Sequence, residues 1–117
     1  MKGRGATVDL PADVRATIEK IVDAAKRVCR AERIVLFGSY ATGDARSESD
    51  IDVLVVAETD SPFQIMRSIH RALREAGVSS PVDVVVVTPA QWEYLKDIPG
   101  QVVHEAAHYG VLLYEAA

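Results

Sequence analysis

The sequence contains very little cysteine, since Cys29 is the only one among 117 residues. One cysteine forms neither an internal disulfide nor a cysteine-based zinc site, which excludes disulfide-stapled and zinc-finger-like folds. Positive charge is not in excess either, because 13 Lys and Arg residues accompany 17 Asp and Glu residues. With a net charge of −4, we expect no general attraction to nucleic-acid phosphates or anionic membranes, although a local basic patch could still exist, and we expect no long nucleic acid as a partner.

Long hydrophobic runs are also absent. No apolar run reaches the length of about 20 residues that crosses a bilayer, and the start MKGRGATVDLPADV has no signal-peptide apolar region. We therefore expect a cytoplasmic protein that is not associated with membranes. Hydrophobic residues make up 49% of the chain, and no repeat or low-complexity linker divides it. These features predict one domain over residues 1–117.

Apolar residues recur at three- and four-residue intervals along residues 11–29, which predicts an amphipathic helix. Short β-branched runs at 33–37, 51–56 and 82–87 predict buried strands. Further helices are expected between Pro62 and Gly77, from Thr88 onward and after Gly100, followed by a last short strand at 111–114. Strands that alternate with helices predict an α/β fold with helices flanking one central sheet.

Three aspartates stand at the starts of the two most apolar strands. Asp50 and Asp52 are two residues apart, so their side chains project from the same face, and neither has a basic neighbour in sequence. Asp83 interrupts the run VDVVVV, where an unpaired buried charge would be costly. Each aspartate alone fits a solvent-facing turn residue. Together they fit a site for a divalent cation better, and hard oxygen ligands suit Mg²⁺.

Gly38 and Ser39 follow the first predicted strand, where a short helix could begin. Backbone N–H groups there, with the serine hydroxyl, would form a phosphate cradle. This cradle and the aspartates converge only if the first strand runs antiparallel to the second and the third runs parallel to the second. We therefore expect a mixed sheet. The stretch GSYATGDA is not a P-loop, because Asp44 and Ala45 replace the Lys and Ser/Thr of that motif.

These residues together resemble the DNA polymerase β nucleotidyltransferase superfamily. The stretch FGSYATGDARSESDIDVLVV is similar to the minimal, antitoxin-like nucleotidyltransferases, which share Gly-Ser, a second glycine and Ser-Asp-x-Asp before an apolar strand. Asp83 matches the third carboxylate of that family, and the ending GVLLYE is also similar. The resemblance covers nearly the whole chain and implies a single nucleotidyltransferase domain with a small mixed sheet flanked by helices. One departure is Thr42, where many relatives carry a basic residue.

The resemblance implies nucleotidyl transfer from ATP or another nucleoside triphosphate to a hydroxyl, with pyrophosphate as the leaving group. Asp50 and Asp52 would hold two Mg²⁺ ions, which stabilise the attacking and leaving oxygens. Asp83 would complete the site of the ion that binds the attacking hydroxyl. The three aspartates are thus the implied catalytic and metal-binding residues.

Four further residues are implied contacts of the nucleotide. Gly38 and Ser39 would hold the β- and γ-phosphates. Arg46 could neutralise triphosphate charge, or it could be a solvated loop residue. Ser49 could touch the nucleotide, or it could cap the turn into the second strand.

The resemblance also implies a protein partner. Stand-alone minimal nucleotidyltransferases are similar to antitoxins that act with a HEPT-domain toxin, and some transfer AMP to a tyrosine of that toxin. The alternative is a non-catalytic binding module that neutralises its partner by contact. Arg67, Arg71 and Arg74 recur at helical spacing and form either a solvated face or a contact for an acidic partner. The sequence leaves open which nucleotide is used and whether a homodimer forms.

A competing metal motif is HEAAH at residues 104–108, which matches the H-E-x-x-H pattern of zinc hydrolases. Four apolar residues form the arc of a helical wheel that we expect to face the core: Val102, Val103, Ala106 and Ala107. His104, Glu105 and His108 fall on the opposite side, toward solvent rather than a cleft. No third ligand follows at the required spacing. We therefore predict that HEAAH is not a metal site.

Overall fold

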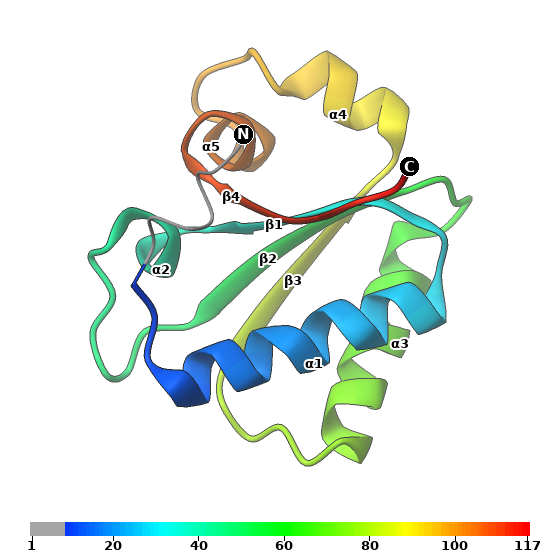
Figure 1. The fold of residues 1–117 in the computed structure, drawn as a ribbon. Coiled ribbons are helices and arrows are strands. Elements are labelled where there is room, and N and C mark those ends of the chain that lie inside the picture. The colour runs from blue at the N-terminus through cyan, green and yellow to red at the C-terminus, as the bar shows by residue number, and fades with distance from the viewer. Residues whose placement is uncertain (1–8) are drawn as a thin grey trace.

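Four strands form one central sheet in the computed structural model, which describes residues 9–117 (Figure 1). All the predicted helices and strands are present, with ends that differ by a few residues at most. The elements follow one another as α1 (Ala12–Val28), β1 (Ala31–Phe37), α2 (Ser39–Thr42), β2 (Ile51–Ala57), α3 (Pro62–Glu75), β3 (Val82–Val87), α4 (Pro89–Leu95), α5 (Val102–Tyr109) and β4 (Val111–Glu115).

The strand order in the sheet is β3-β2-β1-β4. Strand β1 runs antiparallel to β2 and to β4, whereas β2 and β3 are parallel. The mixed sheet expected from the sequence is therefore confirmed. Because of these directions, the end of β1 and the starts of β2 and β3 lie at the same edge of the sheet.

Helices cover both faces of the sheet, with α1 and α3 on one face and α4 and α5 on the other (Figure 1). Alternate residues of β1 and β2 point to opposite faces of the sheet, where they belong to two separate hydrophobic cores. Ile34, Leu36, Val53 and Val55 pack under α1 and α3. Val35, Phe37, Leu54 and Val56 pack under α4 and α5, together with Trp92, Val103 and Ala106 of those helices. This alternation decides on which face each polar strand residue lies.

Side-chain caps fix the starts of two helices. The Ser61 hydroxyl accepts a hydrogen bond from the Gln64 backbone N–H at 3.3 Å, and Pro62 occupies the first turn of α3. Thr88 and Gln91 form the predicted capping box at α4, with reciprocal bonds of 3.1 and 2.8 Å. Among the helices of residues 9–117, none has the length and apolar character to cross a membrane.

Candidate active site

Asp52 and Asp83 lie side by side on the face of the sheet that α4 and α5 cover, and Asp50 directly precedes β2. Asp52 and Asp83 are register partners on the parallel strands β2 and β3. Asp52 alternates with Leu54 and Val56, which belong to the core under α4 and α5, and Asp50 lies two residues before it. Asp50 and Asp83 are exposed, whereas Asp52 is half-buried. The shared face and edge that the sequence predicts are thus confirmed for Asp52 and Asp83, whereas Asp50 lies in the loop directly before β2.

Negative charge at this edge is not compensated. Burial, followed by the carboxylates of Asp83, Asp50 and Glu105, raises the pKa of Asp52 above its ordinary value. Within the described part of the chain, no Lys, Arg or His forms an ion pair with any of these four residues. The site is therefore suited to bind a cation.

Gly38 brings the end of β1 against Asp52. Its φ of 76° is in the left-handed region, and a Cβ atom at this position would collide with Oδ2 of Asp52 and lie 3.1 Å from its Cγ. Helix α2 begins directly afterwards at Ser39, and its first backbone N–H groups have no partner within the helix. A glycine is required here because the backbone approaches the aspartate so closely. The predicted cradle and the aspartates are therefore neighbours.

Arg46 and Ser49 belong to the loop between α2 and β2. The Arg46 backbone N–H donates to Ser49 Oγ at 2.7 Å, and the Ser49 N–H donates to the Arg46 carbonyl at 3.0 Å. These bonds favour the turn-capping role for Ser49. Arg46 lines a pocket of about 320 Å³ with Tyr40 and Leu10, and no aspartate of the site lines that pocket. The role of Arg46 as a contact of the nucleotide stays a prediction.

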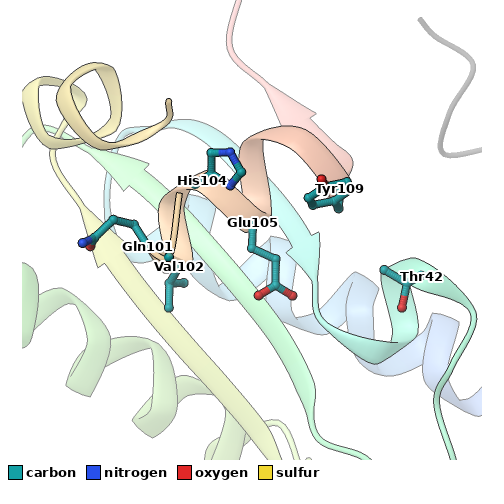
Figure 2. Close-up of a pocket in the computed structure, with 7 residues that line it drawn as sticks. Thr42, Gln101, Val102, His104, Glu105 and Tyr109 are labelled. Atoms are coloured by element: carbon teal, nitrogen blue, oxygen red, sulfur yellow. The ribbon is translucent and has the colours of Figure 1, made fainter. Parts of the chain in front are cut away.

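Helix α5 corrects two predictions about residues 102–108. Val103 and Ala106 are buried as expected, but Val102 is 45% exposed and not part of the core. The buried centre of the apolar arc was predicted correctly. The arc is narrower than predicted, because no described residue covers the side of α5 on which Val102 lies. Glu105 and His104, predicted to face solvent rather than a cleft, line a pocket between α5 and α2 (Figure 2).

This α2–α5 pocket has a volume of about 380 Å³. Its lining residues are Thr42, Gly100, Gln101, Val102, His104, Glu105 and Tyr109. The Glu105 carboxylate points from α5 toward the space beside α2 (Figure 2). His108 is outside this lining, and its Nε2 lies 3.2 Å from Asp97 Oδ1. Glu105 therefore lines a pocket that the helical wheel did not predict, although the i, i+3, i+7 spacing of Val102, Glu105 and Tyr109 could have indicated that the three lie within reach of one another.

Comparison with known families decides the classification. The family described as "Polymerase beta, Nucleotidyltransferase" matches residues 19–116. The chain belongs to this nucleotidyltransferase family. The resemblance deduced from Gly38, Ser39 and the three aspartates is therefore confirmed.

Two curated relatives of this nucleotidyltransferase come from Methanocaldococcus jannaschii and are provisionally named protein adenylyltransferases. The first, MJ0604, is 46% identical over 50 residues, which are 41% of this chain and 50% of that protein. The second, MJ0141, is 30% identical over 82 residues, which are 70% of this chain and 78% of that protein. The match thus spans half the length of the first relative and more than three quarters of the second.

Solved structures share the fold. A Sulfolobus solfataricus protein, provisionally named a nucleotidyltransferase, superposes with a TM-score of 0.57 at 21% identity, over 93% of this chain and 92% of that one. A structure described as a toxin–antitoxin with AMP-PNP superposes with a TM-score of 0.60 at 24% identity, over 84% of this chain and 73% of that one. These similarities confirm the nucleotidyltransferase-like α/β fold.

The carboxylates of this nucleotidyltransferase fit Mg²⁺ through an open site rather than a closed cage. Among residues 9–117, no three His, Cys, Asp or Glu side chains are arranged so that they could hold a metal ion together. Mg²⁺ is commonly bound by one or two carboxylates plus water and substrate phosphates. Asp50 and Asp52, with uncompensated charge next to the start of α2, match that pattern. The donors present therefore fit an ion that binds together with the nucleotide.

Proposed function

We propose that the chain transfers a nucleoside monophosphate from a nucleoside triphosphate, AMP from ATP in the leading case, to a hydroxyl acceptor in the presence of Mg²⁺. The acceptor oxygen forms a bond to the α-phosphorus, the bond between that phosphorus and the bridging oxygen breaks, and pyrophosphate leaves. The observation that carries the proposal is the meeting of Asp50, Asp52 and Asp83 beside Gly38, without any compensating cation in the described chain.

Each residue has a distinct part in this proposal. Asp50 and Asp52 would hold two Mg²⁺ ions, whose chemistry is to neutralise the phosphates and stabilise the attacking and leaving oxygens. Asp83 would complete the acceptor side and favour loss of the hydroxyl proton. Gly38 lets the backbone approach Asp52 without a side chain in the way, and Gly38 and Ser39 would hold the β- and γ-phosphates through backbone N–H groups and the serine hydroxyl.

We further propose a HEPT-type toxin protein as the acceptor, with this chain as its antitoxin. The provisional names of the two relatives and the description of the toxin–antitoxin neighbour support a protein acceptor. The face of α3 offers a second contact surface. Arg67, Arg71 and Arg74 line a groove of about 250 Å³ with Met66 and His70. None of the three arginines forms an ion pair with residues 9–117, which leaves them available for an acidic segment of the partner.

Transfer of label from α-³²P ATP tests the catalytic proposal. Asp52→Asn is expected to abolish Mg²⁺-dependent transfer to a co-purified HEPT protein, because one carboxylate of the metal-binding pair is lost. Asp60→Asn is the matched control, since Asp60 is exposed in the loop before α3, and it should retain wild-type transfer. Unchanged transfer by Asp52→Asn would show that the carboxylates are not catalytic.

Mass spectrometry of the co-expressed partner separates the enzyme from the binding module. The enzyme adds the mass of one nucleoside monophosphate to the partner, and the Asp50→Asn/Asp52→Asn double variant does not. The binding-module alternative predicts that this double variant still rescues cells from the toxin. If the double variant rescued cells although no mass was added to the toxin, the chain would neutralise the toxin by contact and not by nucleotidyl transfer.

A further inference from the structure

The α2–α5 pocket adjoins the carboxylates but is chemically different from them. Glu105 is close enough to Asp52 for its charge to act on that carboxylate. The rest of the lining is mixed, with the Thr42 hydroxyl, the Gln101 amide, the apolar Val102 and the ring of Tyr109. A volume of about 380 Å³ lies within the range of small-molecule sites, roughly 300–1,000 Å³. The pocket is therefore large enough and varied enough for an organic ligand.

One face of α5 points its side chains at this pocket. Val102, Glu105 and Tyr109 are three and four residues apart, so they lie on adjacent turns of the same side. Val102 is 45% exposed and Tyr109 is 62% exposed, although both have large apolar surfaces. Glu105 lies between them, and its side chain points away from α5 (Figure 2). A single acidic acceptor is thus bordered by apolar and aromatic surface.

The charge of Glu105 indicates which part of a nucleotide belongs there. A carboxylate repels phosphate oxygens, but it accepts strong hydrogen bonds from hydroxyl groups. If the α-phosphate is bound at Asp50 and Asp52, the next group along the nucleotide is the ribose, which carries two hydroxyls. Glu105 borders Asp52 on the α5 side, whereas the start of α2 borders it on the Gly38 side. With the β- and γ-phosphates at Gly38 and Ser39, the ribose and base would extend to the other side of Asp52, where Glu105 borders the α2–α5 pocket.

We propose that the α2–α5 pocket binds the nucleoside of the triphosphate, with Glu105 accepting a hydrogen bond from a ribose hydroxyl and Val102 and Tyr109 bordering the base. This inference rests on the proposed function, because it takes the α-phosphate to lie at Asp50 and Asp52. It assigns Glu105, the second residue of the HEAAH stretch, to recognition of the ribose.

Binding of charge-matched nucleotides tests the proposal without any acceptor. Dissociation constants of ATP, 2′-deoxy-ATP and 3′-deoxy-ATP are measured by calorimetry with Mg²⁺, and inorganic triphosphate serves as the probe without a nucleoside. We expect the wild type to prefer ATP about tenfold over the analogue that lacks the bonded hydroxyl, as for a hydrogen bond to a charged group. Glu105→Ala should lose this preference, and Glu105→Gln should keep part of it.

The comparison of ratios removes the general effect of charge. Loss of a carboxylate strengthens binding of every phosphate compound, but it does not alter the ratio between ATP and its deoxy analogue. Glu75→Gln, at an exposed position on the other face of the sheet, is the matched control and should keep the wild-type ratio.

Three results would overturn the inference while leaving the proposed function intact. The wild type could bind ATP no better than inorganic triphosphate, it could bind ATP and both deoxy analogues equally, or Glu105→Ala could keep the wild-type preference. If Glu105→Ala kept the wild-type preference for ATP but transferred the nucleotide to the acceptor more slowly, the pocket would bind the acceptor instead. Failure of the wild type to bind any of the probes with Mg²⁺ would instead contradict the proposed function itself.

Discussion

The two faces of the sheet differ in how much of their length the helices can cover. The 17 residues of α1 and 14 residues of α3 extend about 26 and 21 Å at 1.5 Å per residue. The seven-residue strands β1 and β2 extend about 23 Å at 3.3 Å per residue. Helices α4 and α5 have only 7 and 8 residues, or about 11 and 12 Å. One face is therefore covered from end to end, and the other is covered over about half of its length.

The difference explains why the carboxylates can exist where they do. Under α1 and α3 the strand residues from Ile51 to Ala57 that point to that face are all buried and apolar. On the opposite face, Leu54 and Val56 are buried under the short helices, whereas Asp52 lies near the start of the same strand, at the edge of the sheet. A carboxylate at an equivalent place under α1 would be desolvated and unpaired. The long helices thus stabilise the sheet, and the short ones leave room for ions and substrate.

Truncation of the core under α3 should give the largest effect on stability. Ile69 is fully buried between α3 and the sheet, and we expect Ile69→Ala to lower the free energy of unfolding by about 2–5 kcal/mol. Urea denaturation measures the loss, and transfer per folded molecule should stay unchanged. Phe63→Ala on the same helix is the control, because Phe63 is 59% exposed and should cost about 0.5 kcal/mol or less. A large loss of transfer in folded Ile69→Ala would contradict the division of roles between the two faces.

A glycine pair tests the active-site edge. Gly38 and Gly43 both have positive φ, but only at Gly38 would an added Cβ meet another residue, Asp52. Gly38→Ala should displace the carboxylate and lower the rate of transfer about a hundredfold or more, as small misplacements of reacting groups do. Gly43→Ala has the same kind of backbone strain with open space around it, so it should cost about 1 kcal/mol of stability and keep most activity. Initial rates of transfer and thermal melts of both variants measure these effects. If both variants lost activity equally, backbone strain at the two ends of α2 would be the cause, and not the collision of the new Cβ atom with Asp52.

The mixed sheet could be predicted because a common site for the cradle and the aspartates requires it. Asp52 and Asp83 each begin an apolar strand, and Gly38 ends one, so a common site requires one antiparallel and one parallel pairing. Period-two alternation then places Asp50 and Asp52 on one face. The positions of these residues along the chain are local properties, whereas the strand pairing is a tertiary one, and the observed register between Phe37 and Asp52 agrees with the predicted antiparallel pairing.

The role of α5 could not be predicted in the same way. A helical wheel gives the direction of the apolar arc, and Val103 and Ala106 do lie at its buried centre. It does not give the elements that cover the edges of the arc. Val102 is exposed and Glu105 lines a pocket because α5 is short and lies opposite the end of α2, which is a tertiary arrangement. The H-E-x-x-H pattern drew attention to the two histidines, whereas the residue beside the aspartates is the glutamate between them.

The smallest expected effect is on the stability of the fold, which the ionised Asp52 carboxylate lowers at neutral pH. The pKa of Asp52 is raised by burial and by neighbouring carboxylates, so the folded state keeps the proton to a higher pH than the unfolded chain does. Stability is therefore lost as the pH rises above the ordinary aspartate value of about 3.9 and through the raised folded value. Asp52→Asn should melt at a modestly higher temperature than the wild type at neutral pH, and this advantage should vanish below that ordinary value.

Thermal melts at several pH values, with Mg²⁺ and with EDTA, measure this effect. Mg²⁺ binds the folded wild type and should raise its melting temperature at neutral pH, while EDTA reverses the rise. Asp52→Asn should gain less from Mg²⁺, since one of the metal-binding carboxylates is gone. Asp60→Asn, at an exposed loop position, should follow the wild type under every condition. If Asp52→Asn were instead destabilised at neutral pH, the carboxylate would be contributing to folding, and the two faces would not divide stability and chemistry as their helices indicate.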